Sequence, residues 1–207
     1  MIDKIASAYG RNDEVPNIEL AEELCKTENI EGIKEIVAGV HNKDKKIAND
    51  CIKVLYEIGE RKPFLISDYC SDFIELLSSK NNRLVWGAMT ALSCITDMEG
   101  EKIFRNLEIV LNAYEQGSVI TVDNSMTVLA KLCNVSPTYS ERVFPILLEH
   151  LRTCRPKEVP QHSERISICV NETNMAEFIS ILETRKEYLS DPQTKRINKI
   201  EKNLLKK

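Results

Sequence analysis

Three stretches of the chain carry the same stripe of apolar residues, 37 residues apart. The middle stretch, residues 81–97, reads NNRLVWGAMTALSCITD and predicts one amphipathic helix. A fixed period of this length is typical of stacked supersecondary repeats, none of which can bury its apolar face alone. The three equivalent triads are Ile52, Leu55 and Ile58, then Met89, Leu92 and Ile95, then Met126, Leu129 and Leu132.

A second set of positions has the same period and predicts another helix in each repeat. Its members follow the i, i+3, i+4, i+7 spacing that places four side chains on one helix face. The sixteen positions, all apolar or aromatic, are Ile33, Ile36, Val37 and Val40, Cys70, Phe73, Ile74 and Leu77, Leu107, Val110, Leu111 and Tyr114, and Phe144, Leu147, Leu148 and Leu151. We call these the A helices, and we call the helices of the first set, expected at residues 44–59, 82–97 and 119–134, the B helices.

The pattern predicts one domain over residues 1–207, built of repeats with atypical ends. The repeats are expected at residues 27–62, 63–99, 100–136 and 137–173, between an N-terminal cap at 1–26 and a C-terminal cap at 174–207. Turns such as that at Glu99-Gly100 should close the repeats. In the fourth repeat, Pro156 and Pro160 interrupt the B helix, so we expect a loop there and helix again near Ser163.

Composition and charge add limits to this picture. Apolar residues make up 43% and charged residues 29% of the 207, with a formal charge of -4, which disfavours attraction of the whole surface to nucleic acid or anionic membrane. No stretch has the length of a membrane span or of a signal-peptide core. The seven cysteines include no C-x-x-C pair, so we expect reduced thiols and a cytoplasmic protein.

Two-helix repeats of this length, with NKDKKIANDCIKVLYEIGE before the middle stretch, resemble HEAT repeats, which are related to armadillo repeats. The resemblance covers about residues 28–170. Asp44 and Lys46 match the acidic and basic residues near the A-to-B turn of a HEAT repeat, and Arg83 with Ala88 match it in part, whereas Ile120 stands where the third basic residue would be. The resemblance implies an all-α fold, a right-handed α-solenoid of about four to five two-helix repeats. It also implies a non-enzymatic scaffold or adaptor.

One flank of the expected B helices carries the candidate binding residues. In HEAT and armadillo proteins the last helix of each repeat lines the concave surface, and the Asn and Trp ladders with which armadillo proteins grasp peptides resemble this flank. We therefore expect a protein or peptide partner there. The alternative is that Trp86, the only tryptophan, packs between neighbouring B helices, and both interpretations can hold together. The six residues are Asn49, Lys53, Trp86, Thr90, Asp123 and Thr127, of which Lys53 is expected to be exposed.

Few residues have the spacing of a catalytic or metal site. The chain has no Gly-rich phosphate loop, no Gly-x-Ser-x-Gly motif and only three histidines. The strongest metal candidate is the set His150, Cys154, His162 and Cys169, because the first two are i, i+4 and can face one ion from the same helix. Structural zinc sites normally supply ligands in close pairs, so we favour unrelated surface histidines and buried cysteines without an ion, and we expect neither metal nor cofactor.

Two other functions stay open. The first is nucleic-acid binding, as in HEAT-like DNA glycosylases, although the net acidity argues against it. The second is a HEAT-like lyase or enzyme accessory that acts on a bound cofactor. A basic cluster at the end of the chain suits the first function or a solvated helix end, and its members are Lys195, Arg196, Lys199, Lys202, Lys206 and Lys207.

Overall fold

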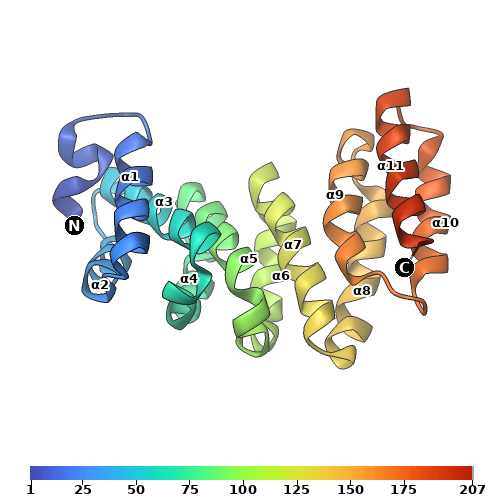
Figure 1. Cartoon of the computed structure of the whole chain (residues 1–207), viewed down its shortest axis with the longest axis horizontal. Coiled ribbons are helices and arrows are strands. Elements are labelled where there is room, and N and C mark those ends of the chain that lie inside the picture. The colour runs from blue at the N-terminus through green and yellow to red at the C-terminus, as the bar shows by residue number, and fades with distance from the viewer. Residues whose placement is uncertain (207) are drawn as a thin grey trace. The chain divides into compact units, whose positions relative to one another are not determined.

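The computed structural model describes residues 1–206, and these form helices joined by short turns, with no strand among them (Figure 1). The all-α prediction is therefore confirmed, and the helices pack in the repeated manner of an α-solenoid. The packing divides the chain into two compact units, Met1–Ser125 and Met126–Lys207, and each is described by itself. A single domain over the whole chain stays a prediction.

The first unit contains an N-terminal cap and the A and B helices of the first repeats. Its A helices are α2, α4 and α6, and its B helices are α3, α5 and the first part of α7. The elements are the 3-10 helices η1 (Ile2–Lys4) and η2 (Ala6–Tyr9), α1 (Val15–Thr27), α2 (Ile30–Gly39), α3 (Lys45–Arg61), η3 (Pro63–Leu65), η4 (Ser67–Tyr69), α4 (Cys70–Leu76), α5 (Asn82–Arg105), α6 (Leu107–Gln116) and α7 (Val119–Val135).

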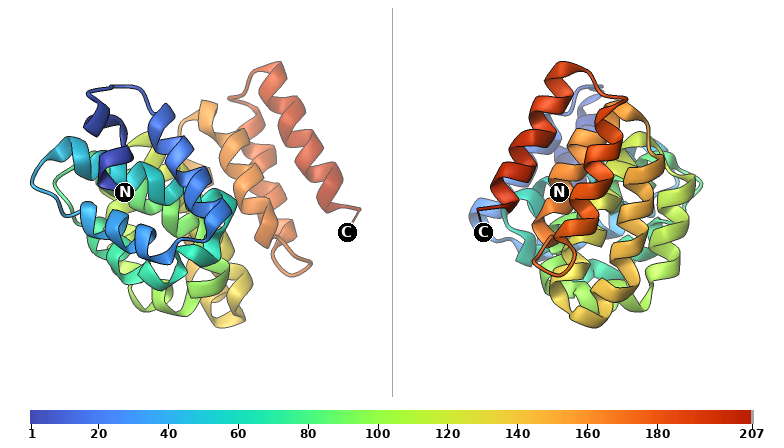
Figure 2. Two further views of the ribbon diagram at one scale, coloured as in Figure 1. Left: turned by 60° about the vertical axis from the view of Figure 1, so that its left-hand side comes forward. Right: turned by 90° about the vertical axis from the view of Figure 1, so that its right-hand side faces the viewer.

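Helix α3 is the centre of the first unit, since it packs against α1 and α2 and also against α5. The close approach of α3 and α5 depends on Gly87, because a Cβ atom there would lie 2.6 Å from Cγ1 of Ile52 on α3. Any side chain at this position would push the two B helices apart. The left view of Figure 2 shows these helices side by side.

The start of each B helix repeats with the same period as its core. The Asp44 carboxylate accepts a hydrogen bond of 2.8 Å from the backbone N–H of Lys46, and the Asn81 side chain accepts one of 3.1 Å from that of Arg83. Ser118 occupies the third equivalent position. Such N-cap side chains satisfy backbone donors that have no partner within the helix.

The predicted apolar stripes form the core of both units. All nine B-helix positions are fully buried, from Ile52 to Leu132. Of the sixteen A-helix positions, only Leu111 and Tyr114 on α6 stay partly exposed. The predicted registers of the A and B helices therefore agree with the burial of their side chains.

The turn expected at Glu99-Gly100 is a kink inside α5 rather than the end of the helix. Glu99 leaves the helical region with φ -111° and ψ 19°, and helix then continues to Arg105. The extra turns are held because Ile103 is fully buried. A short polar sequence thus bends this helix without ending it.

The second unit contains the rest of α7, then α8 (Pro137–Thr153), the 3-10 helix η5 (Pro156–Glu158), α9 (Val159–Ile166), the 3-10 helix η6 (Ser167–Cys169), α10 (Met175–Lys186) and α11 (Asp191–Leu204). Helix α8 packs against α9 and α10, and α11 packs against the same two helices. The right view of Figure 2 shows α10 and α11 side by side.

The prediction of a loop through Pro156 and Pro160 is wrong, although Ser163 does lie in a helix as predicted. Pro156 opens η5, and α9 begins at Val159 with Pro160 in its first turn. Proline is tolerated at the start of a helix because the N–H that it lacks would have no helical partner there. Across residues 1–206, no helix has both the length and the apolar character needed to cross a membrane.

Replacing Leu92 with alanine should lower the free energy of unfolding by about 2 to 5 kcal/mol, because the side chain is fully buried in the B-helix stripe and its loss leaves a cavity. Urea denaturation of the full chain would measure the change. Met98→Ala is the control, since Met98 lies on the same helix and is exposed. Equal losses in the two variants would contradict the assigned register.

Candidate partner-binding surface

Five of the six candidate residues lie on the B helices of the first unit. Asn49 and Lys53 are on α3, Trp86 and Thr90 are on α5, and Asp123 is on α7. The sixth, Thr127, belongs to the second unit, where its hydroxyl accepts a hydrogen bond of 2.5 Å from Nη1 of Arg165. We describe the surface from the residues of the first unit alone.

Trp86 is half-buried and held on two sides. Its ring lies 5.6 Å from the ring of Tyr56, with the two planes tilted by 47°, and the Arg83 guanidinium lies over it at 4.5 Å. Tilted aromatic pairs and an arginine over an indole ring are both attractive arrangements. Trp86 therefore joins α3 to α5 and still presents part of its ring to solvent.

The prediction that Lys53 is exposed is wrong, because the side chain is only 6% exposed. Its ammonium group forms ion pairs with Glu14, at 3.0 Å, and with Glu57, at 2.5 Å. Helix α1 packs across α3, and the residue that precedes α1, Glu14, reaches position 53. Lys53 is thus an internal cation rather than a contact for a partner.

The two carboxylates connect Lys53 to two arginines. Glu14 pairs with Lys53 and Arg83, and Glu57 pairs with Lys53 and Arg61. Burial by itself would raise the pKa of both carboxyl groups, but hydrogen bonds from these cations hold each pKa below its usual value. Burial would lower the pKa of Lys53, yet its hydrogen bonds raise it. The network is therefore charged at neutral pH and fixes Arg83 over the indole ring.

Two other polar candidates on α3 and α5, Asn49 and Thr90, already form hydrogen bonds within the protein. Oδ1 of Asn49 accepts a hydrogen bond of 2.8 Å from Asn81, and the Thr90 hydroxyl donates to the Trp86 carbonyl and accepts from Asn124. Within residues 1–206 neither the amide NH2 of Asn49 nor the indole N–H of Trp86 donates a hydrogen bond. We call Asn49, Arg83 and Trp86 the Trp86 surface; its available groups are hydrogen-bond donors.

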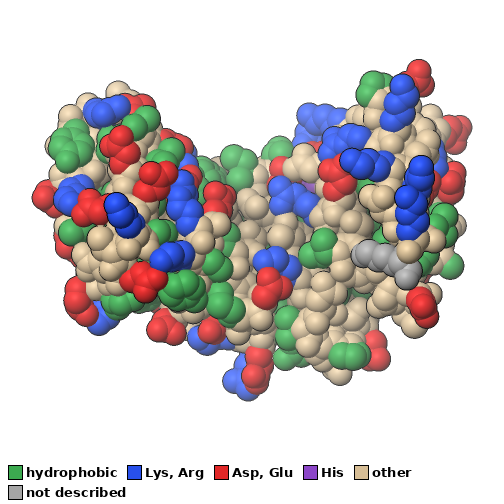
Figure 3. All heavy atoms as spheres, in the orientation of Figure 1, with side chains coloured by type: hydrophobic (Ala, Val, Ile, Leu, Met, Phe, Trp, Pro, Cys, Tyr) green, Lys and Arg blue, Asp and Glu red, His purple; other side chains and the backbone are tan. Residues whose placement is uncertain are grey.

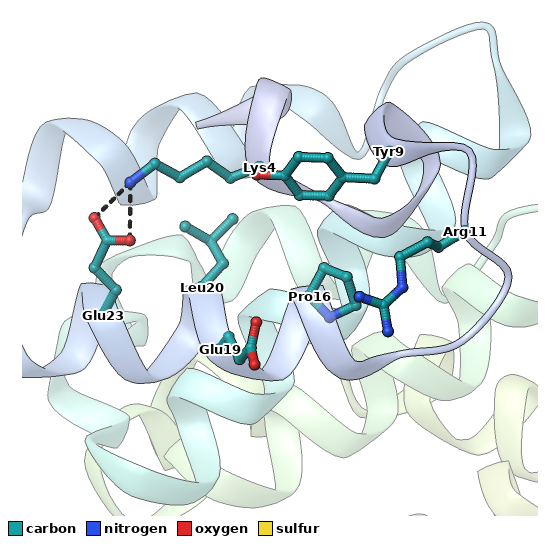
Figure 4. Close-up of a pocket in the computed structure, with 7 residues that line it drawn as sticks. All are labelled: Lys4, Tyr9, Arg11, Pro16, Glu19, Leu20 and Glu23. Atoms are coloured by element: carbon teal, nitrogen blue, oxygen red, sulfur yellow. Dashed lines mark hydrogen bonds and ion pairs between the residues drawn. The ribbon is translucent and has the colours of Figure 1, made fainter.

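A separate hollow of about 520 Å³ lies at the N-terminal cap, between η1, η2 and α1 (Figure 4). Lys4 and Tyr9 extend along one edge, and Pro16 and Leu20 form the floor. Nζ of Lys4 is held by the Glu23 carboxylate at 2.7 and 2.8 Å. Two cations and two carboxylates line the hollow, so it favours neither an anionic nor a cationic ligand. The lining residues are Lys4, Tyr9, Arg11, Pro16, Glu19, Leu20 and Glu23.

Three of the four metal candidates lie together in the second unit, and the expectation of surface histidines is wrong, because His150 and His162 are both buried. The potential ligand atoms of His150, Cys154 and His162 are all within 4.8 Å of one another. Cys169 is not in this group, and its buried thiol donates a hydrogen bond of 3.1 Å to the Ile166 carbonyl. Burial raises the pKa of the Cys154 thiol to about 11, so the thiol is protonated at neutral pH.

No protein-family profile matches the chain, and no curated protein matches it significantly. Several solved structures, in contrast, superpose on the chain. An engineered protein superposes with a TM-score of 0.65 at 13% identity, covering 99% of this chain and 96% of its own. A designed armadillo repeat protein gives 0.61 at 11%, covering 99% and 100%, and a second engineered protein gives 0.60 at 16%, covering 98% of each.

The chain has an armadillo/HEAT-like repeat fold. At these identities the likeness shows the fold alone, and it assigns neither activity nor partner. The resemblance in the repeats is thereby confirmed at the level of architecture.

Three residues of this armadillo/HEAT-like surface were missed in the sequence. Tyr56 and Arg83 could have been found, since each lies three residues from a candidate, Lys53 and Trp86 respectively, and residues at that spacing share a helix face. Glu14 has no such signal. It is 39 positions before Lys53, and only the packing of α1 on α3 brings them together.

Replacing Glu57 with glutamine should lower the free energy of unfolding at pH 7 by about 1 to 3 kcal/mol, because Lys53 and Arg61 lose a buried ionic partner. The pKa of Glu57 is lower in the folded protein than its usual 4.5, so its contribution is full above pH 4.5 and is lost as pH falls through the folded pKa. Urea denaturation of both proteins between pH 7 and pH 2 would show the difference shrinking.

Glu60→Gln is the control for this pH effect, because Glu60 lies on the same helix and is exposed. Its stability difference from the wild type should be small at every pH. A Glu57→Gln effect that stayed constant down to pH 2 would contradict the role of the carboxylate charge.

Proposed function

We propose that the protein is a non-enzymatic scaffold or adaptor that binds a protein or peptide partner on the Trp86 surface. The observation that supports this most is the half-buried Trp86 ring, fixed by Tyr56 and Arg83, with its indole N–H available for a partner. Tryptophan, tyrosine and arginine are the residues that most often dominate binding energy in interfaces. A ring that is already fixed loses little conformational freedom on binding.

The donors on this surface favour a partner rich in hydrogen-bond acceptors. The indole N–H of Trp86 and the amide NH2 of Asn49 can both donate to backbone carbonyls, which an extended peptide presents at regular intervals. The fold adds support, since repeat proteins offer long surfaces on successive helices. We also propose that the protein works in the cytoplasm, because its seven cysteines include no C-x-x-C pair.

A second candidate function is nucleic-acid binding through α11. Lysine and arginine side chains gather over the C-terminal helices on the face in Figure 3. Lys195, Lys199, Lys202 and Lys206 are exposed, whereas Arg196 is paired with Glu164 at 2.6 Å. Lys207, the last member of the predicted basic cluster, lies outside the described residues.

A peptide selected from a random display library on the full chain should change the fluorescence of Trp86, which is the only tryptophan. Replacing Trp86 with alanine should then weaken binding by about 2 kcal/mol or more, roughly 30-fold, because the central anchor is lost. Isothermal titration would measure the affinity of each variant.

Three variants separate binding from folding. Trp86→Phe keeps an aromatic ring between α3 and α5 but removes the N–H donor, while Asn49→Ala and Asp123→Ala change polar groups on the same flank. Each is compared with the wild type for thermal midpoint and peptide affinity. If Trp86→Ala unfolds the protein while the other three keep full affinity, the flank is architecture and the proposal is wrong.

Binding to mixed-sequence duplex DNA should be weak at 150 mM salt, because the formal charge of the chain is -4. A titration at 50, 100 and 200 mM salt would test this by fluorescence anisotropy. Tight binding that falls steeply with salt, and that is lost when Lys195 and Lys199 become glutamine, would favour the second candidate instead.

A further inference from the structure

The end of α8 and the start of α9 bring two buried histidines face to face. Nε2 of His150 lies 2.7 Å from Nδ1 of His162, and the side chains are 7% and 0% exposed. Their rings are tilted by 52°, with centroids 4.7 Å apart. The thiol of Cys154 completes a group whose potential ligand atoms all lie within 4.8 Å of one another.

The local sequence explains why these three side chains meet. His150 is in the last turn of α8, and the backbone N–H of Cys154 bonds to the His150 carbonyl at 2.8 Å, so Cys154 stays one turn above His150 on the same side. The chain then turns through η5, and α9 returns His162 to the same place. The turn with Pro156 and Pro160 therefore builds the group.

We propose that His150, Cys154 and His162 form a binding site for a zinc-class transition-metal ion. Tetrahedral zinc with bonds of about 2.0 to 2.3 Å places neighbouring ligand atoms roughly 3.3 to 3.6 Å apart. The two nitrogens are closer than this and the whole group is within 4.8 Å, so rotations of side chains suffice to accept an ion.

The donors select the class of ion. Two imidazoles and a thiolate suit zinc and copper, whereas magnesium and calcium require oxygen ligands. Three protein ligands leave one position for water or for an external donor, as in catalytic rather than closed structural zinc sites. Cys154 is also the least buried of the three, which gives the ion a route from solvent.

Metal binding requires two proton movements. The Cys154 thiol loses its proton to solvent as the metal–sulfur bond forms. One of the two facing nitrogens carries the proton of the hydrogen bond between the histidines, and this proton must leave that position. In the metal-bound form the remaining imidazole protons are on Nδ1 of His150 and Nε2 of His162, so one ring changes tautomer.

Neighbouring residues hold the backbone of the site in place. The Arg185 guanidinium, from α10, donates to the carbonyl of Arg152 and, at 2.5 Å, to that of Cys154. These bonds fix the last turn of α8 and the position from which the thiol projects. Such outer hydrogen bonds usually orient metal ligands.

The alternative is that the two histidines are a hydrogen-bonded pair within the core and bind no metal ion. Cys154 distinguishes a metal site from a simple histidine pair, because the histidine pair gives Cys154 no role. Its thiol makes only a weak contact of 3.9 Å with the Leu151 carbonyl. A substitution at Cys154 should therefore alter metal binding while leaving the histidine pair intact.

The test is a titration of the reduced full chain with Co²⁺, which reports cysteine coordination by thiolate-to-metal charge-transfer absorption, followed by displacement with Zn²⁺. We expect one equivalent of Co²⁺, displacement by Zn²⁺, and a thermal midpoint several degrees higher with Zn²⁺ in large excess. Cys154→Ser should lose the charge-transfer band and weaken Zn²⁺ binding roughly 100-fold.

Cys94→Ser is the matched control, since Cys94 is also partly exposed and is not in the group. It should keep the band, and so should Cys169→Ser. Circular dichroism would show that each variant is folded, and His162→Gln gives a second loss of affinity that does not depend on sulfur. The proposal is overturned if the wild type shows no thiolate band at 100 µM Co²⁺, or if the band survives in Cys154→Ser.

Discussion

The burial of the B-helix stripe is the constraint on which the rest of the structure depends. A B helix cannot hide its apolar face alone, so α3 must lie between α1 and α5, and Gly87 lets α5 approach Ile52 closely. This packing fixes which flank of each B helix remains at the surface. The location of Trp86 at the surface is a consequence of this packing.

The Trp86 surface shows how a buried charge can fix side chains at the surface of the protein. Lys53 is inaccessible to a partner, yet with Glu14 it holds Arg83 over the indole ring. Breaking such a buried network leaves a charge without its partner, which costs more than losing an ion pair at the surface. Stability and the arrangement of the proposed binding surface are therefore coupled at this flank, and substitutions there must be tested for both.

The second unit departs from the repeat at the turn between α8 and α9, where the side chains of His150, Cys154 and His162 meet. Two prolines open short helices instead of a loop, and the resulting turn places His162 against His150. Regular repeats align equivalent positions on one face, whereas an irregular turn can bring together residues that the period keeps apart. The histidines and Cys154 belong to the second case.

The sequence by itself determined the helices, their period and their buried faces, because apolar spacing within one helix is a local property. It also determined that Asn49, Trp86 and Asp123 occupy equivalent positions. Only the tertiary structure decided that Lys53 is buried and that Glu14 is its partner, since the packing of α1 on α3 depends on contacts distant in sequence. It likewise decided that Cys154 lies beside His162 while Cys169 does not, because the path of the chain after α8 has no periodic signal.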